Sequence, residues 1–415
     1  MPRLFGRALA GFLLAVSAVS AQTALTWEQV RERFRANNPN LTAGRAGVEQ
    51  SKAQEITAYL RPNPEATATL DQLDPFSINP YRPLGNTLPL ISGSYLHERE
   101  HKRELRRDSA QNATVIAAST LEDQERTLLF SLRSAFVGIL HAKEILRVAR
   151  DNLAYYDRVL EVNRTREQAG DISEVDLGRL ELQRVQYESD VQTAEVSLRT
   201  AKIQLLGLLN DRTPIEQFDV SGKFDFSEQI TPLEEFRIAA LDARPDLKAA
   251  LQAVVKSKTD HQLAIANGSA DPTFAVDFGR NPPIPVYFGA SVTIPLRIFD
   301  RNQGEKLRTQ LDISRNQALV EAGRAQVFSD VDSAYAAIAG NIALLRPYKD
   351  KYLQQAAKVR DTIAFAYQNG GASLLDFLSA QNDYRNIQLS YLNLVGSYMT
   401  AAGQMNLAVG KEVIP

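Results

Sequence analysis

The amino-acid sequence predicts a mainly α-helical protein made of two similar halves, each with a β-hairpin and a long helical hairpin. The first observation is an internal repeat with an offset of 200 residues. Three residue types recur at the two turns, first as Gly170, Ser173 and Asp176 and then as Gly370, Ser373 and Asp376. The second observation is that apolar residues follow both turns at alternate spacings of three and four. This spacing is typical of supercoiled helices packed on neighbours.

Residues 1–21 resemble a secretory signal. Arg3 and Arg7 precede an apolar stretch over 8–16, and Val19-Ser20-Ala21 has the small residues of a cleavage site. Loss of this segment changes the formal net charge from −2 to −4, so no basic footprint for nucleic acid is expected. The chain has 0 cysteines, which excludes disulfides and a cysteine-linked lipid anchor.

Each half opens with a helical stretch that a proline interrupts, at Pro39 in the first half and at Pro245 in the second. We therefore divide the exported chain into a first repeat over 22–210, a linker over 211–231, a second repeat over 232–410 and a tail over 411–415. Within the repeats, the β-hairpins are expected at about 64–97 and 272–297, and the helical hairpins at 98–210 and 301–410.

The β-hairpins show a period of two. Phe274, Val276 and Phe278 alternate with small or polar residues, and the alternation returns over 288–296. Strands of about 9–11 residues with one apolar face are typical of transmembrane barrels, although a soluble hairpin packed on helices shows the same alternation. No apolar stretch after the signal approaches the roughly 20 residues of a membrane helix. Since four strands cannot close a membrane barrel, whose smallest form has about eight, several copies would have to share one.

The longest helices follow the β-hairpins. No proline occurs between Pro89 and Pro214, and apolar residues keep the three–four spacing from Leu128 to Leu160. A helix over about 97–165 would be roughly 100 Å long, which predicts a rod or a tube. Pro347 should kink the corresponding helix of the second half.

His97-Glu98-Arg99-Glu100-His101 matches the zinc-protease pattern H-E-x-x-H. That motif normally lies on a buried helix with a third ligand, whereas this stretch continues into Lys102, Arg103 and Arg106. The interpretation we favour is a polar strand-to-helix junction at a membrane–water boundary.

The repeated turns carry the remaining candidate site. Gly170 and Gly370 should be left-handed turn residues, and Ser173 and Ser373 should cap the outgoing helices. Asp176 and Asp376 then fall in the first helical turn, where a carboxylate favours the helix dipole. Alternatively, the turns gather around an axis and these carboxylates form a ring at a pore mouth. Both readings remain open on the sequence.

Together these residues resemble the TolC-type outer membrane efflux proteins over essentially the whole exported chain. The segment 294–304, IPLRIFDRNQG, is similar to a stretch of the heavy-metal-efflux (CzcC-like) branch. A Lys-Arg-x-x-Arg stretch of that branch is matched by Lys102, Arg103 and Arg106.

The resemblance implies a homotrimer in the outer membrane of a Gram-negative-type envelope, with one shared twelve-stranded barrel and a large periplasmic helical tunnel. It implies contact of the turns at Gly170, Ser173, Gly370 and Ser373 with a periplasmic adaptor protein, and an inner-membrane pump of the resistance-nodulation-division class. It also places a membrane-boundary junction at Lys102, Arg103, Arg106 and Arg301.

The family's periplasmic gate uses a tyrosine, a basic residue and acidic residues next to this turn. Tyr367 and Asp376 match, whereas Ala372 and Ser379 stand at a basic and an acidic position. We therefore expect the aperture to include Tyr367, Asp376 and Ser379, with Asp176 and Arg179 of the first repeat as substitutes.

No nucleophile–base set, phosphate loop or metal-ligand cluster is evident, so neither an enzyme nor a cofactor is expected. The predicted function is passive conduction of substrates, such as heavy-metal cations or small toxic molecules, from pump and adaptor to the exterior. The alternatives are a periplasmic coiled-coil adaptor or scaffold and, third, a secreted zinc protease.

Overall fold

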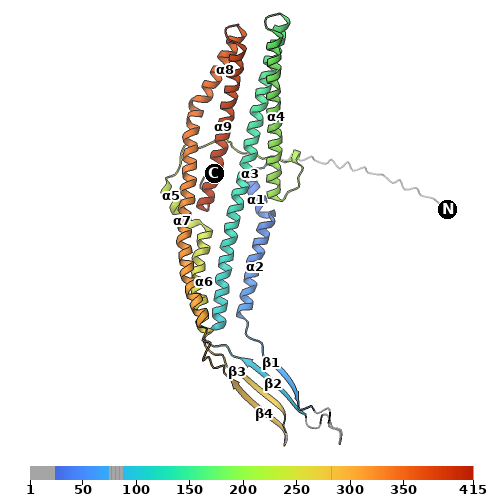
Figure 1. The fold of residues 1–415 in the computed structure, drawn as a ribbon, viewed down its shortest axis with the longest axis vertical. Helices are drawn as coiled ribbons and strands as arrows, with labels where there is room; N and C mark the ends of the chain where they lie inside the picture. Colours follow the sequence, from blue (N-terminus) through green and yellow to red (C-terminus); the bar gives the residue numbers. More distant parts are fainter. Residues whose placement is uncertain are drawn as a thin grey trace, which may run out of the picture.

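The protein is a long rod with helices along most of its length and a small sheet at one end (Figure 1). A computed structural model describes residues 24–73, 76, 80, 84, 87–281 and 283–414. The turns of two helical hairpins lie at the end opposite the sheet. The predicted fold class, long helices with a small antiparallel sheet, is confirmed.

The same order of elements occurs twice along the chain. The first series is α1 (Trp27–Asn37), α2 (Pro39–Tyr59), β1 (Glu65–Asp71), β2 (Leu88–Leu96), α3 (Lys102–Gln168) and α4 (Glu174–Leu209). A short 3₁₀ turn, η1 (Ile215–Gln217), follows in the connecting segment. The second series is α5 (Leu233–Ala243), α6 (Pro245–Ala266), β3 (Thr273–Asn281), β4 (Ile284–Thr293), α7 (Gln303–Pro347), η2 (Tyr348–Tyr352), α8 (Leu353–Gln368) and α9 (Leu374–Val409).

The four strands form one antiparallel sheet in the order β1-β2-β3-β4, so the two β-hairpins join through β2 and β3. The predicted alternation is confirmed on β3 and β4, where apolar side chains are exposed: Phe274, Val276, Phe278, Phe288 and Val292. The expected last strand over 288–296 is displaced, since β4 ends at Thr293. Pro295 lacks the N–H that a continuing ladder needs, which explains the earlier end. Among the described helices, none combines the length and apolarity needed to cross a membrane.

The α3 helix is the spine of the rod. It is 67 residues long and packs on α4 and α9 toward the hairpin turns, and on α2 and α6 toward the sheet. Its buried side chains follow the predicted spacing of three and four: Leu132, Phe136, Ile139, Leu146, Ala149, Tyr156 and Leu160. The helix starts at Lys102 rather than at the expected residue 97, because Glu100 and His101 are left-handed.

Arg184 stands where the repeat predicts an apolar residue on α4. Its Nε donates to Asp157 Oδ1 of α3 at 2.6 Å, and its side chain also pairs with Glu188 at 3.1 Å. The aliphatic part of the side chain can therefore follow the helix interface while the guanidinium forms ion pairs at its edge.

The ends of α4 and α9 meet the first two helices of their own halves at two related polar joints. In the first half, buried Asn38 caps α2 and its Nδ2 donates to Leu208 O of α4 at 3.0 Å. In the second half, buried Arg244 donates from Nη1 to Ala408 O of α9 at 3.3 Å. Because the last carbonyls of a helix have no partner within the helix, each joint satisfies one of them.

Arg244 is also the centre of an ion-pair cluster. It binds Asp246 and Asp330, with 2.6 Å between nitrogen and oxygen in each pair. Burial alone would raise the pKa of Asp246, but Arg244 reverses this effect and holds that pKa below its usual range. The two carboxylates therefore compensate the buried guanidinium charge.

Pro347 ends the regular part of α7, at the position where the sequence predicts a kink. The next residues, Tyr348–Tyr352, form a π-helical segment before α8 continues. A proline nitrogen cannot donate to the carbonyl one turn earlier, and a wider helical turn accommodates the lost hydrogen bond.

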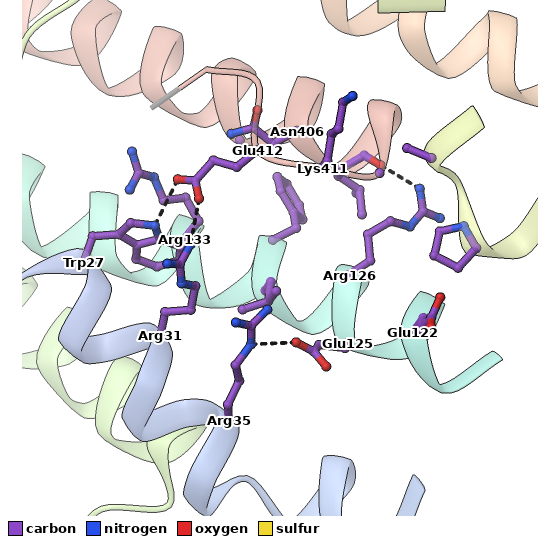
Figure 2. A pocket seen from close by; sticks show the side chains of 17 residues that line it. Trp27, Arg31, Arg35, Glu122, Glu125, Arg126, Arg133, Asn406, Lys411 and Glu412 are labelled. Atoms are coloured by element: carbon purple, nitrogen blue, oxygen red, sulfur yellow. Dashed lines mark hydrogen bonds and ion pairs between the residues drawn. The ribbon is translucent and has the colours of Figure 1, made fainter. Parts of the chain in front are cut away.

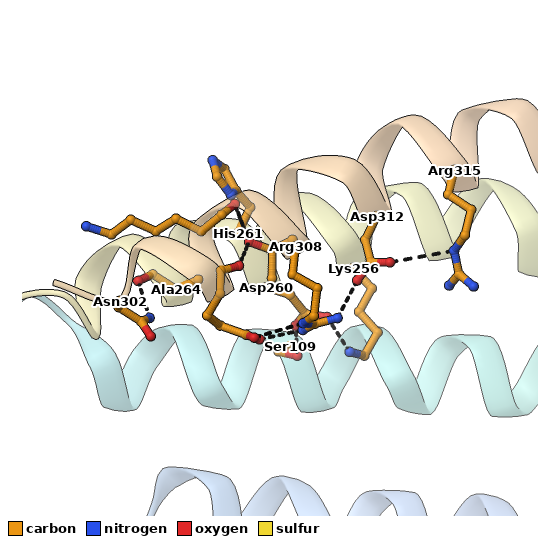
Figure 3. Close-up of polar contacts among 12 residues, drawn as sticks. Ser109, Lys256, Asp260, His261, Ala264, Asn302, Arg308, Asp312 and Arg315 are labelled. Carbon is orange, nitrogen blue, oxygen red and sulfur yellow. Dashed lines mark hydrogen bonds and ion pairs between the residues drawn. The ribbon is translucent and has the colours of Figure 1, made fainter. Parts of the chain in front are cut away.

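Polar side chains join α3, α6 and α7 near the sheet (Figure 3). Asp260 of α6 accepts hydrogen bonds from Ser109 of α3 and from Lys256, the latter at 2.6 Å. On the next interface, His261 Nδ1 lies 2.9 Å from Thr309 Oγ1 of α7. These contacts set the register of the three helices where few large apolar side chains are buried.

The Arg244 cluster generates a stability prediction. Replacing a buried charge leaves its partners uncompensated, so Arg244→Gln should lower the free energy of unfolding by about 3 kcal/mol. The matched control is Arg150→Gln, which breaks an exposed pair with Glu195 and should cost less than about 1 kcal/mol. Urea unfolding followed by circular dichroism measures both free energies of unfolding. Equal losses in the two variants would contradict a stabilising role for the Arg244 cluster.

Candidate functional site

The turns of the two helical hairpins have the same backbone. Gly170 and Gly370 have φ values of +82° and +75°, a region that favours glycine. Ser173 Oγ accepts a hydrogen bond from Asp176 N at 3.1 Å, and Ser373 Oγ accepts one from Asp376 N at 3.2 Å. The predicted left-handed turn residues and N-caps are thus confirmed at both turns.

An aromatic core lies directly behind the turns and joins the two hairpins. Tyr156 of α3 and Tyr187 of α4 have ring centroids 4.8 Å apart, and Tyr367 of α8 stacks on Phe377 of α9 at 5.0 Å. Tyr156 OH donates to Leu180 O at 3.1 Å. Burial raises the pKa of Tyr187 to about 12, so these phenols stay neutral at physiological pH.

Tyr367 connects the hairpins through a buried hydrogen bond. Its OH donates to Asn163 Oδ1 of α3 at 3.0 Å, and Asn163 Nδ2 donates to Val159 O at 2.8 Å. Arg166 lies over the Tyr367 ring at 5.5 Å, and its Nη1 is buried without an acceptor among the described residues. The structure therefore joins Tyr367 to a residue of the first repeat.

Asn163 and Arg166 were missed from the sequence. A signal for Asn163 was available, because the next position in the three–four spacing after Leu160 is residue 163. A polar residue at a core position of a helical repeat generally needs a specific partner. No comparable signal marks Arg166, which lies next to Tyr367 only in the folded chain.

The predicted acidic residues lie at the tips rather than in the aromatic core. Asp376 is exposed and accepts from Ser373 Oγ at 2.6 Å and Ser373 N at 3.1 Å, and these hydrogen bonds lower its pKa. Asp176 pairs with Arg179 at 3.7 Å on the surface of α4, and Ser379 is exposed on α9. Among the described residues, no hydrogen bond or ion pair links Tyr367 to either aspartate.

A second candidate region is the junction between sheet and helices. Lys102 is 3% exposed, and its Nζ donates to Asp271 Oδ2 at 2.6 Å and to Ser269 O at 2.8 Å, so it ties the two halves together. Arg106 pairs with Glu98. Arg103 lies over the Tyr59 ring at 4.4 Å, and Arg301 is exposed before α7.

The H-E-x-x-H residues do not share a helix face. His97 follows β2, and its N–H donates to Pro272 O at 2.9 Å. His101 is the left-handed N-cap of α3, and Glu98 is engaged by Arg106. The zinc-protease alternative is therefore wrong, because two imidazoles one helical turn apart are the geometry that chemistry requires.

The exposed surface of the tips includes two equivalent apolar side chains. Val175 and Leu375 follow the capping serines, and they are 66% and 76% exposed. Between the hairpins, Arg385 of α9 pairs with Asp190 of α4 at 2.6 Å. The tips thus combine carboxylates, apolar side chains and an internal hydrogen bond between hairpins.

Comparisons with known proteins agree with this architecture. No family model matches the sequence. The chain is 24% identical to the cobalt-zinc-cadmium resistance protein CzcC of Cupriavidus metallidurans, covering 86% of this chain and 83% of the relative. It is 25% identical to the pyoverdine export outer membrane protein OpmQ of Pseudomonas putida, covering 87% and 80%.

Solved structures show the same fold at lower identity. CusC superposes with a TM-score of 0.77 at 15% identity, covering 93% of this chain and 92% of that chain. The outer membrane channel CmeC of Campylobacter jejuni gives 0.75 at 14% identity, covering 94% and 87%. With its duplicated helical hairpins and four-stranded sheet, the chain has the fold of these solved structures, and over most of its length it is similar to TolC-type outer membrane efflux proteins.

Proposed function

We propose that this chain is the outer membrane channel of a tripartite efflux system and conducts its substrates passively. The observation that carries the proposal is the division of one rod into a sheet with an exposed apolar face and a helical part that ends in paired tips. An adaptor or scaffold, the alternative function, does not require the seven large apolar side chains that β3 and β4 expose.

The functional unit is a homotrimer whose subunits share one barrel. Within the described part of a single chain, β1 and β4 are edge strands, and no other strand pairs with the outer side of either backbone. Unpaired backbone groups are costly in a bilayer, and only closure removes both edges. Pairing of β4 with β1 of the next copy would give twelve strands in three chains, with the exposed phenylalanines and valines against lipid.

The junction residues would then lie at the membrane boundary. Arg301 is exposed close to the sheet and is suited to lipid phosphates, whereas Arg103 is partly buried and already pairs with Glu104 at 2.9 Å. Lys102 is buried against Asp271, so its role there is to hold the sheet on the helices.

The aperture lies at the hairpin tips. Three copies would bring Asp176 and Asp376 into a ring of carboxylates around the axis, which favours cations. The Tyr367–Asn163 hydrogen bond would hold the second hairpin against the first in the closed state. Arg179 and Ser379 are exposed beside the carboxylates and complete the rim.

The adaptor would dock on the turns that contain Gly170, Ser173, Gly370 and Ser373. The exposed Val175 and Leu375 offer it an equivalent apolar contact on each hairpin. A pump of the resistance-nodulation-division class would supply the energy. The heavy-metal branch of the family and the CzcC relative favour metal cations as substrates, and small toxic molecules are the second class.

The trimer is tested by its mass. Purified protein should have three chains per particle by light scattering in detergent, with the detergent mass subtracted, because only shared strands complete the barrel. The protein should lose solubility when the detergent is removed. A stable monomer in plain buffer would contradict the proposal.

The carboxylate ring is tested by Asp376→Lys in planar bilayers. Reversed charge at the aperture should reduce cation selectivity and change single-channel conductance. Asp361→Lys is the matched control, since Asp361 is exposed on α8 farther from the turn and should leave conductance unchanged. Unchanged conductance for Asp376→Lys in properly inserted trimers would exclude a role for this carboxylate.

The Tyr367–Asn163 contact is tested by Tyr367→Phe. Loss of the hydroxyl leaves a buried amide oxygen without its donor, so the closed state should lose about 1 kcal/mol or more. Open channels should become about fivefold or more frequent in bilayer recordings. Tyr335→Phe, at a partly buried tyrosine of α7 away from the turns, serves as the control. Equal opening in both variants would refute a closing role for the contact.

A further inference from the structure

A cavity of about 460 Å³ lies at mid-rod, where α1, α3 and the end of α9 meet (Figure 2). The channel function makes no use of it. Five basic side chains line it, against three acidic ones. The basic set is Arg31, Arg35, Arg126, Arg133 and Lys411, and the acidic set is Glu122, Glu125 and Glu412.

Most of these charges are compensated within the chain. Arg31 pairs with Glu412 at 2.8 Å, and Arg35 pairs with Glu125 at 2.7 Å. Arg126 pairs with Asp123 at 2.6 Å and donates to Leu407 O at 2.6 Å. The cations that remain without a carboxylate within the described part of the chain are Arg133 and Lys411.

Arg133 is the more informative of the two. Its guanidinium lies 4.7 Å from the centre of the Trp27 ring, and no hydrogen bond or ion pair joins it to any described residue. Burial lowers its pKa, yet an arginine in a protein stays protonated. A guanidinium stacked on a ring keeps its N–H groups free at the edge. Burial of this unpaired charge therefore costs free energy, and its N–H groups are available to bind an anion.

Among the described residues, two oppositely charged side chains of the cavity wall lack an ion-pair partner and lie apart: the basic Arg133 and the acidic Glu122. Figure 2 shows Trp27, Arg133 and Glu412 on one side and Glu122 on the other. Glu412 is already engaged by Arg31 and by Trp27 Nε1, which donates to it at 3.2 Å. An anion would therefore bind near Arg133, with the exposed Lys411 of the tail as a second cation.

The rest of the wall is apolar and includes Leu129, Phe130 and Leu407. A small inorganic ion would fill only part of such a volume and would leave this wall in contact with water. We propose that the cavity binds an amphipathic anion, a carboxylate or phosphate head group on a short apolar body. The head group pairs with Arg133, and the body packs on the apolar wall.

The only tryptophan of the chain reports on this site directly, because Trp27 lines the cavity. Full-length protein in phosphatidylcholine nanodiscs is titrated with hexyl phosphate and with hexanoate. Both should change the fluorescence of Trp27 saturably, and bound ligand should raise the unfolding temperature. Hexanol, hexyltrimethylammonium and inorganic phosphate should each bind at least about tenfold more weakly.

Variants separate the site from general charge effects. Arg133→Gln should weaken binding of hexyl phosphate about tenfold or more, because a charge-assisted hydrogen bond is lost. Arg158→Gln, at an exposed arginine of the same helix, should leave it unchanged. If Arg133→Gln does not fold, Lys411→Gln on the exposed tail takes its place, with an expected loss of about threefold.

Three outcomes would overturn the proposal: no saturable response to either anion, equal affinity for hexanol, or equal losses in Arg133→Gln and Arg158→Gln. The source of the anion is distinguished by a titration with dihexanoylphosphatidylglycerol, a short-chain lipid that reaches the cavity from solution. Tighter binding than that of hexyl phosphate identifies a lipid as the occupant. Weaker binding identifies a soluble amphipathic anion.

Discussion

The rod depends on α3, which changes its packing partners once along its length. A helix of 67 residues cannot bury its apolar stripe against a single partner pair, and here α4 and α9 cover it toward the tips while α2 and α6 cover it toward the sheet. Where the partners change, two helix ends would leave carbonyl groups without donors. Asn38 and Arg244 supply those donors, so buried polar side chains make a continuous apolar spine possible.

The two halves keep the same backbone at their turns and joints, but the side chains that make contacts at the hairpin tips differ. Both turns keep a left-handed glycine and a capping serine, and both joints keep a buried polar residue before a proline. The partners of the tip contact diverged, because Asn163 and Tyr367 correspond to Ile363 and Glu167 at the offset of 200. The contact between the hairpins therefore exists once per chain, and the two halves are not equivalent at the tips.

Patterns with a short period were readable from the sequence, and contacts between distant segments were not. The three–four spacing predicted the core of α3, and the repeated Gly-Ser-Asp pattern predicted the turns and caps, since both depend on local geometry. The start of α3 was placed too early because the left-handed residues Glu100 and His101 have no glycine to mark them. The basic cavity brings together α1, α3 and the tail, and no window of sequence contains all three.

The π-helical segment after Pro347 has a mechanical consequence. In the first hairpin, α3 is one uninterrupted helix. In the second hairpin, five π-helical residues separate α7 from α8. A load applied at the tip of the second hairpin meets the weakest hydrogen-bond ladder at Tyr348–Tyr352, and bending concentrates there. The second hairpin therefore has a bending point that the first hairpin lacks, and this point lies well away from the tip that would move.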